Sequence, residues 1–119
     1  MVLKEPKIRD LTIPVQPQLT ASAQELVRGE QLYNVSCSGC HGPNARSGGV
    51  IPDLRMMAPE THKIFKNIVV DGVYAGKGMA GYGDILNEKD TEIIRQYVIS
   101  RALIDKAEAD ALENSAGGR

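Results

Sequence analysis

The chain has 119 residues, the ordinary size of a single domain. Its 14 basic and 15 acidic residues leave a formal charge of -1, which argues against nucleic acid or a membrane surface as the main partner. No apolar run approaches the roughly 20 residues that cross a bilayer, so the sequence predicts no membrane span. Aromatic residues make up only 4% of the chain, with no tryptophan. Side chains alone fill such a core poorly, and a bound flat apolar group would help.

The N-terminal segment, residues 1–20, contains Pro6, Pro14 and Pro17 among charged and β-branched residues. Proline at this density blocks a helix and favours an extended path, so this segment is predicted to form a linker or a strap over the domain. A disordered tail is the alternative. The residues after Met1 are charged and lack the apolar stretch of a signal peptide.

The first helix is predicted to begin at Ser22, which is a good N-cap and forms a capping box with Glu25. Its partly apolar face, which ends near Val35, consists of Leu26, Val27, Leu32 and Tyr33. Gly29 costs a helix about 1 kcal/mol relative to alanine. Its presence therefore predicts that another helix crosses closely at that point, with a tolerated weak spot in the helix as the alternative.

Residues 37–41 read Cys-Ser-Gly-Cys-His, the Cys-x-x-Cys-His signature of c-type haem attachment. Cys37 and Cys40 can add to the two porphyrin vinyl groups, and His41 then lies under the iron as an axial ligand. The two thiols could instead be a dithiol redox centre, half of a zinc site or a disulfide. A zinc site lacks ligands, because His62 is the only other histidine, and no strand–helix–strand setting of a redox dithiol is visible. One covalent haem c is therefore the favoured interpretation.

Between Gly39 and Gly83 the chain carries nine of its 12 glycines, which predicts loops that can approach a flat ligand closely. A short helix beginning at Pro59 interrupts these loops and ends before Asp71. Its predicted apolar stripe consists of Ile64, Phe65, Ile68 and Val69. His62 precedes this stripe and is expected at the surface.

The second axial ligand, opposite His41, is expected to be a methionine. Met79 lies in the glycine-rich stretch 76–83, which is flexible enough to fold over a porphyrin, and is the favoured ligand. Met56 and Met57 are the alternatives, although they look like core-filling residues. Coordination by His and Met stabilises ferrous iron and blocks the position where oxygen or peroxide would bind, which favours an electron carrier.

The last helix is predicted to begin at Asn87, a good N-cap, with Asp90 favourably placed near the positive end of the helix dipole. Its apolar face has helical spacing and consists of Ile93, Ile94, Tyr97, Val98 and Ala102. The face of the first helix from Gly29 to Tyr33 is the expected partner. Residues 105–119 are expected to prolong the helix with exposed, alanine-rich sequence or to fray, most of all from Ser115.

The order of these features resembles a class I cytochrome c, with a haem motif after an N-terminal helix, a methionine loop, and a C-terminal helix that crosses the first. More narrowly, residues 47–55, 78–80 and 97–102 resemble the C-terminal cytochrome domain of PQQ-dependent quinohaemoprotein alcohol dehydrogenases. The resemblance implies an all-α, class I cytochrome c fold around one covalently bound haem, with the cytochrome domain at residues 21–104.

The same resemblance implies roles for residues around the cofactor. The Pro52 carbonyl would accept a hydrogen bond from the imidazole N–H of His41. Leu54 would line the haem, and Arg55 would pair with a haem propionate. A solvated surface charge is the alternative for Arg55.

Together these features predict a one-electron carrier without dehydrogenase activity of its own. The resemblance implies a PQQ dehydrogenase domain as donor, and a cytochrome, a copper protein or a terminal oxidase as acceptor. Such motifs receive haem outside the cytoplasm, so we expect a periplasmic or otherwise exported protein. We expect the chain to be a mature form or an excised domain of a quinohaemoprotein alcohol dehydrogenase.

Two other functions stay open at this point. The first is a free-standing periplasmic cytochrome c that serves another dehydrogenase or oxidase. The second is a haem sensor or peroxidase, which is less favoured because no distal histidine or arginine lies near Met79. Docking charges are expected at Arg46, Lys63, Lys66 and Lys77, with ordinary solvated side chains as the alternative.

Overall fold

The computed structural model describes residues 13–47 and 53–117, and the regular elements within these ranges are all helical. The predicted all-α architecture is therefore confirmed. The α-helices are α1 (Ala23–Ser36), α2 (Ser38–His41), α3 (Pro59–Lys63), α4 (Phe65–Val69) and α5 (Glu88–Gly117). Short 3₁₀ turns at Pro43–Ala45, Leu54–Met56 and Ala75–Lys77 lie in the connections.

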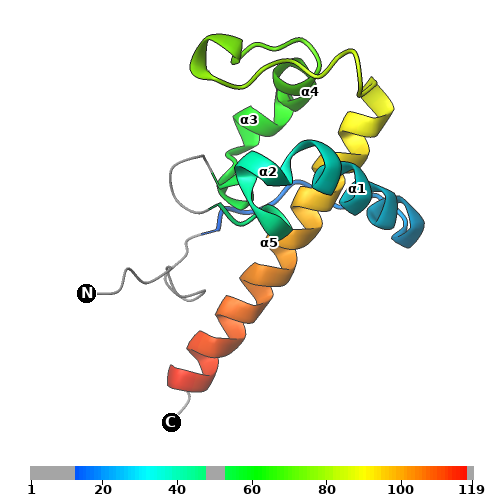
Figure 1. Ribbon diagram of the computed structural model, residues 1–119. Coiled ribbons are helices and arrows are strands. Elements are labelled where there is room, and N and C mark those ends of the chain that lie inside the picture. The colour runs from blue at the N-terminus through cyan, green and yellow to red at the C-terminus, as the bar shows by residue number, and fades with distance from the viewer. Residues whose placement is uncertain (1–12, 48–52, 118–119) are drawn as a thin grey trace.

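Two helices that are distant in sequence, α1 and α5, cross in the middle of the molecule (Figure 1). Gly29 lies at the crossing, where an added Cβ would be 2.6 Å from the Ile93 carbonyl oxygen and 3.0 Å from the Tyr97 Cβ. Tyr33 and Tyr97 are buried beside it with their ring centroids 5.2 Å apart. The predicted close crossing at Gly29 is confirmed.

Both long helices begin at their predicted caps. The Ser22 hydroxyl accepts from the Glu25 N–H at 3.1 Å, and the Glu25 carboxylate accepts from the Ser22 N–H at 2.9 Å. The Asn87 side-chain oxygen accepts from the Asp90 N–H at 2.7 Å. These bonds satisfy N–H groups that have no partner inside a helix, so each helix start is determined by local sequence.

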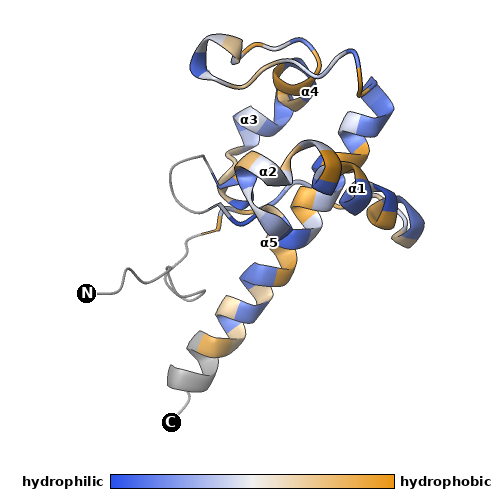
Figure 2. Ribbon diagram, in the orientation of Figure 1, coloured by the Kyte–Doolittle hydropathy of each residue, from blue (hydrophilic) through white to orange (hydrophobic). Residues whose placement is uncertain are grey.

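The core lies where α1, α4 and α5 meet. α4 contributes Phe65 and Val69, and the loop before α5 contributes Leu86. The buried face of α5 matches the predicted spacing and includes Ile94, Tyr97, Val98 and Ala102. Figure 2 shows apolar residues concentrated in this region, whereas the C-terminal half of α5 mixes apolar and polar residues.

The predicted single helix after Pro59 is wrong in one respect, because it breaks at Ile64 into α3 and α4. Ile64 has φ -108° and ψ 15° and is 38% exposed, so it is not part of the buried stripe. The surface position expected for His62 is also wrong, since His62 is only 6% exposed. His62, in α3 before the break, lies beside Arg95 of α5 with Nδ1 and Nη1 3.3 Å apart, and this distant contact is what buries it.

Fraying from Ser115 is expected from the sequence, but α5 continues to Gly117. The C-terminal part of this helix projects beyond the body of the molecule (Figure 1). The predicted domain boundary at residue 104 falls inside this helix. Residues 105–112 were expected to be exposed, yet Asp105 is fully buried and Ala109 is 9% exposed. Arg46 and Arg55, from the connections after α2, donate hydrogen bonds to Asp105. The spacing of residues along the sequence does not reveal this burial.

Residues 13–20 are extended and lie along α5. The N–H groups of Thr20 and Ala21 donate to the Gln96 side-chain oxygen at 2.8 and 3.1 Å. Lys106 Nζ donates to the Ile13 carbonyl at 3.3 Å, and Ile13 is buried. This part of the predicted linker or strap therefore packs on the long helix, while residues 1–12 lie outside the described residues.

Candidate haem site

The two cysteines and the histidine of the motif lie on one helical turn directly after α1. The Cys37 N–H donates to the Tyr33 carbonyl at 2.8 Å, and the His41 N–H donates to the Cys37 carbonyl at 2.9 Å. Cys37 is half-buried, Cys40 is exposed, and neither is part of a disulfide. The His41 side chain, at 8% exposure, belongs to the buried part of the molecule. The turn thus carries a half-buried and an exposed cysteine, which would hold a haem covalently, next to a buried histidine.

The backbone after His41 makes a tight turn that only glycine permits. Gly42 has φ +84°, and an added Cβ would be 1.9 Å from the Arg46 carbonyl oxygen. The Tyr33 hydroxyl donates to the Gly42 carbonyl at 2.6 Å, and burial raises the pKa of that hydroxyl. Helix α1 therefore holds the backbone next to the histidine in place through a neutral, buried phenol.

The thiol chemistry disfavours the other interpretations of the motif. Burial, together with neighbouring Cys40, raises the pKa of the Cys37 thiol to about 11. A redox-active dithiol instead needs a low pKa, because the thiolate is the reactive form. Among the described residues no group of three or more His, Cys, Asp or Glu side chains is placed to hold a metal ion. The free thiols fit covalent attachment of a haem.

The loop that carries Met79 is closed by its own backbone. The Met79 N–H donates to the Tyr74 carbonyl at 3.2 Å, and the Tyr82 N–H donates to the Val69 carbonyl at 2.6 Å. Gly72 and Gly81 touch at the base, where a Cβ on Gly81 would be 3.1 Å from the Gly72 Cα. A side chain at either glycine would push these two backbone segments apart, so the glycines help to determine the shape of the loop.

Apolar side chains from several segments pack on the same core as Cys37 of the motif. Half-buried residues that pack on the same core are Leu32, Cys37, Leu54, Met57, Met79 and Tyr82. The structure therefore brings Met79 and Leu54, two predicted haem contacts, to the core that carries the motif. Met57 reaches this core as well, so it stays the main alternative ligand, and Met56 is half-buried.

Arg55 is buried at 4% exposure, so the alternative of a solvated surface charge is wrong. Its guanidinium donates to both carboxylate oxygens of Asp53, at 3.0 and 2.6 Å, and to Asp105 at 3.0 Å. Its predicted contact with a propionate stays a prediction beside these partners. Pro52, the predicted acceptor for His41, lies outside the described residues.

The four expected docking charges differ in their surroundings. Arg46 is paired with buried Asp105 at 2.7 Å, and Lys66 lies 3.4 Å from Glu88. Lys63 is exposed, and Lys77 lies over the Tyr74 ring with Nζ 5.1 Å from its centroid. Lys63 and Lys77 are therefore better placed than Arg46 to meet a partner.

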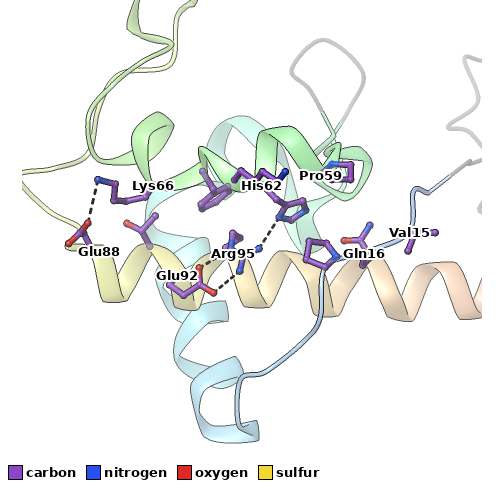
Figure 3. Close-up of a pocket in the computed structure, with 12 residues that line it drawn as sticks. Val15, Gln16, Pro59, His62, Lys66, Glu88, Glu92 and Arg95 are labelled. Atoms are coloured by element: carbon purple, nitrogen blue, oxygen red, sulfur yellow. Dashed lines mark hydrogen bonds and ion pairs between the residues drawn. The ribbon is translucent and has the colours of Figure 1, made fainter.

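A separate cavity of about 720 Å³ lies between residues 15–17, α3, α4 and the start of α5 (Figure 3). His62 lines it, and burial together with Arg95 lowers the pKa of this histidine. The hydrogen bond from Arg95 lowers the pKa of Glu92 in the same group. None of the predicted haem residues lines this cavity, so it is distinct from the haem site.

Sequence reasoning missed the surroundings of two buried groups, His62 and Asp105. The Glu92–Arg95 pair has helical i,i+3 spacing, which could have indicated a salt bridge but not that Arg95 lies beside His62. Asp105 had no local signal, because its arginine partners come from distant loops.

A protein-family model described as cytochrome c oxidase, cbb3-type, subunit III matches residues 24–98. This chain belongs to the cytochrome c family. The matched range holds the motif, the methionine loop and both crossing faces, and the family implies a covalently bound haem c and electron transfer.

Several curated proteins are similar to this cytochrome. Quinohemoprotein alcohol dehydrogenase ADH-IIG of Pseudomonas putida is 40% identical over 100 residues, which is 84% of this chain and 14% of that protein. The dehydrogenase subunit of alcohol dehydrogenase (quinone) from Gluconobacter oxydans is 37% identical over 106 residues, 87% of this chain and 14% of that one. Cytochrome c550 of Pseudomonas aeruginosa is 34% identical over 76 residues, which is 60% of this chain and 52% of that protein.

A solved structure of quinohemoprotein alcohol dehydrogenase ADHIIG from Pseudomonas putida HK5 matches the fold with a TM-score of 0.75 and 35% identity. The match covers 88% of this chain and 15% of that chain. The cytochrome therefore spans about one seventh of such relatives, as the 14% coverage shows. The predicted class I cytochrome c fold and the predicted relationship to quinohaemoprotein cytochrome domains are both confirmed.

The relationship also determines what kind of protein this is. The matched parts of the relatives are electron-transfer domains, so the chain is an electron carrier rather than an enzyme. No helix in the described part of the chain combines the length and the apolar character needed to cross a membrane.

Proposed function

We propose that this cytochrome carries single electrons with one haem, bound through Cys37 and Cys40 and ligated by His41 and Met79. When bound, the haem supplies an iron that alternates between ferric and ferrous states. The observation that carries the proposal is the helical turn 37–41, in which two unbridged thiols precede a buried histidine. The apolar side chains packed on the same core as Cys37 would keep water away from the iron ligands, which would favour the less charged ferrous site.

Each protein group has a distinct part in this site. His41 is oriented by the tight Gly42 turn and, we propose, by the Pro52 carbonyl. Met79 lies in a loop that its own backbone closes, so little further ordering would be needed for its sulfur to bind the iron. Leu54 would contribute apolar surface against the cofactor. With both His41 and Met79 bound, the iron would have no open position for oxygen or peroxide, which would suit electron transfer and not a sensor or peroxidase.

We propose a PQQ-dependent dehydrogenase domain as the electron donor, and a cytochrome, copper protein or terminal oxidase as acceptor. The names of the relatives support this donor, because they are quinone-type alcohol dehydrogenases that contain a segment similar to this chain. Lys63 and Lys77 are the charges we assign to docking, since both are exposed. Covalent haem attachment takes place outside the cytoplasm, so we propose a periplasmic location.

A second candidate is a free-standing carrier that serves another dehydrogenase or oxidase. The similarity to cytochrome c550 supports it, because this chain aligns with 52% of that protein and not with a small part of it. Both candidates use the same chemistry and differ in the partner.

The first experiment is export of the chain in a host that attaches c-type haem, followed by a haem stain of a denaturing gel. A stained band is expected, since thioether links survive denaturation, and Cys37→Ser with Cys40→Ser should abolish it. Low-spin ferric haem with the weak far-red sulfur-to-iron band supports the carrier. High-spin ferric haem, with rapid carbon monoxide binding after reduction, would instead indicate a sensor.

The choice between the two carrier candidates needs the native polypeptide. A haem stain of extract from the source organism, probed in parallel with an antibody against this chain, reports its size. A band of the chain's own size supports the free-standing carrier. A much larger band supports a domain of a dehydrogenase.

A further inference from the structure

Asp105 is a fully buried carboxylate that the electron-transfer site does not yet explain. It lies on α5, two turns after Tyr97, and has no exposed surface. Its Oδ1 accepts from Arg46 Nη2 at 2.7 Å, and its Oδ2 accepts from Arg55 Nη1 at 3.0 Å and from Arg46 Nε at 3.3 Å. Arg101 Nη2 lies 3.7 Å from Oδ1 on the same helix. One carboxylate therefore holds two arginines from outside its own helix.

This carboxylate is charged in the folded protein. Burial alone would raise the pKa of Asp105, but the hydrogen bonds from Arg46 and Arg55 bring it below its ordinary value. Charge-assisted bonds of this kind are short and directional, so they fix the position of the groups that donate. A buried ion pair often adds little net stability, because removing the charges from water costs about as much as their attraction returns. The contribution of this ion pair is to fix the positions of the two arginines rather than to add stability.

The first arginine connects Asp105 to the haem motif. The Arg46 carbonyl oxygen packs against Gly42, where a Cβ would be 1.9 Å away, and Gly42 directly follows His41. The Arg46 N–H also donates to the Pro43 carbonyl at 3.0 Å, so its backbone is part of the same turn. If the Arg46 side chain is held on α5, the turn that orients the histidine is held as well.

The second arginine, Arg55, connects Asp105 to the turn that carries Leu54. Arg55 is fixed between Asp105 and Asp53, and its neighbour Leu54 packs on the core that also contacts Met79. The two arginines thus tie the turn after His41 and the Leu54–Met56 turn to one point of α5.

We propose that Asp105 is a positioning residue of the cytochrome, which acts through Arg46 and Arg55 to set the orientation of His41 and the placement of Leu54. This inference rests on the proposed haem function. Asp105 itself touches neither the iron ligands nor the thiols among the contacts of the described residues.

The test compares Asp105→Asn with Asp110→Asn in haem-loaded protein. Both changes remove one negative charge from α5, but Asp110 is exposed and takes part in none of the arginine contacts given for Asp105. The hyperfine-shifted haem-methyl resonances of the ferric protein report the orientation of the axial ligands, and the reduction potential is measured in the same samples. We expect Asp105→Asn to change the spread of the methyl resonances and to shift the potential, and Asp110→Asn to leave both near the wild type.

A second variant covers the case in which Asp105→Asn does not accumulate as holoprotein. Arg46→Gln breaks the link at its half-exposed end and should change the same resonances. Where both variants load haem, the double variant should change them no more than the larger single change, because the two residues act in one path.

The outcomes separate the inference from the function on which it rests. Unaltered resonances and potential in Asp105→Asn or Arg46→Gln, with only a lower unfolding midpoint, would overturn the positioning role and leave the carrier intact. Independent, additive changes would overturn it too. Absence of covalent low-spin haem in the wild-type protein would instead overturn the proposed function itself.

Discussion

Replacement of Gly29 by alanine should destabilise the crossing of α1 and α5. The added Cβ would lie 2.6 Å from the Ile93 carbonyl oxygen, 3.0 Å from the Tyr97 Cβ and 3.1 Å from the Ile93 Cγ2. The first of these is a backbone atom inside α5, so it cannot move away by a rotamer change. The two helices would have to separate by several tenths of an ångström at the point where the core is most closely packed.

The expected change in the free energy of unfolding is the balance of two opposing effects. Alanine is favoured over glycine inside a helix by about 1 kcal/mol. Overpacking of a tight core costs about 1–3 kcal/mol, and we take the upper part of that range because backbone is involved. The net loss is then about 1–2 kcal/mol, which corresponds to roughly 4–8 °C in the unfolding midpoint of a domain of this size.

The measurement is thermal unfolding of the oxidised holoprotein, followed by far-ultraviolet circular dichroism, with Gln31→Ala as the control. Gln31 is exposed on the same helix, so its replacement removes no buried contact. The control should be close to neutral, since alanine is a slightly better helix former than glutamine. If Gly29→Ala were as stable as the control, the close helix crossing would not be the reason for this glycine.

Three further predictions concern the ligand and two buried ionisable groups. Met79→Ala should lose the far-red band and lower the reduction potential by on the order of 0.1 V, whereas Met57→Leu should keep the band and the potential of the wild type. Ferric absorption spectra and redox titration measure these two properties, and the reverse pattern would make Met57 the ligand. The pKa of Asp105 lies below its ordinary 3.8 in the folded state. Its contribution to stability is therefore present above about pH 4 and is lost as the pH falls further, so urea midpoints should drop less on acidification in Asp105→Asn than in Asp110→Asn. The pKa of His62 lies below its ordinary 6.5, so the unfolded chain takes up its proton first. Stability should then decrease as the pH falls from about 7 to 5, and His62→Gln should remove that part of the decrease; an unchanged slope in that window would contradict the buried neutral histidine.

Local chemistry explains why much of the site could be read from sequence. The spacing of Cys37, Cys40 and His41 is set by one helical turn and by the two vinyl groups, so no distant contact is needed to recognise it. The caps at Ser22 and Asn87 depend on bonds within three residues.

Distant contacts explain where sequence reasoning failed. His62 was expected at the surface because the apolar stripe begins after it, yet it lies beside Arg95 of α5 and is buried. Arg55 was weighed as a propionate partner or a solvated charge, and the structure places it between Asp53 and Asp105. Burial of a charged side chain depends on which partners the rest of the fold delivers, and no periodicity records that.

Residue types at short spacing are enough to predict haem attachment, the starts of both long helices and the point where they cross. The burial of His62 and the pairing of Asp105 with two arginines depend instead on the complete fold. Arg46 and Arg55 are 59 and 50 residues from Asp105 along the chain. Contacts between residues so far apart have energies that no local pattern records.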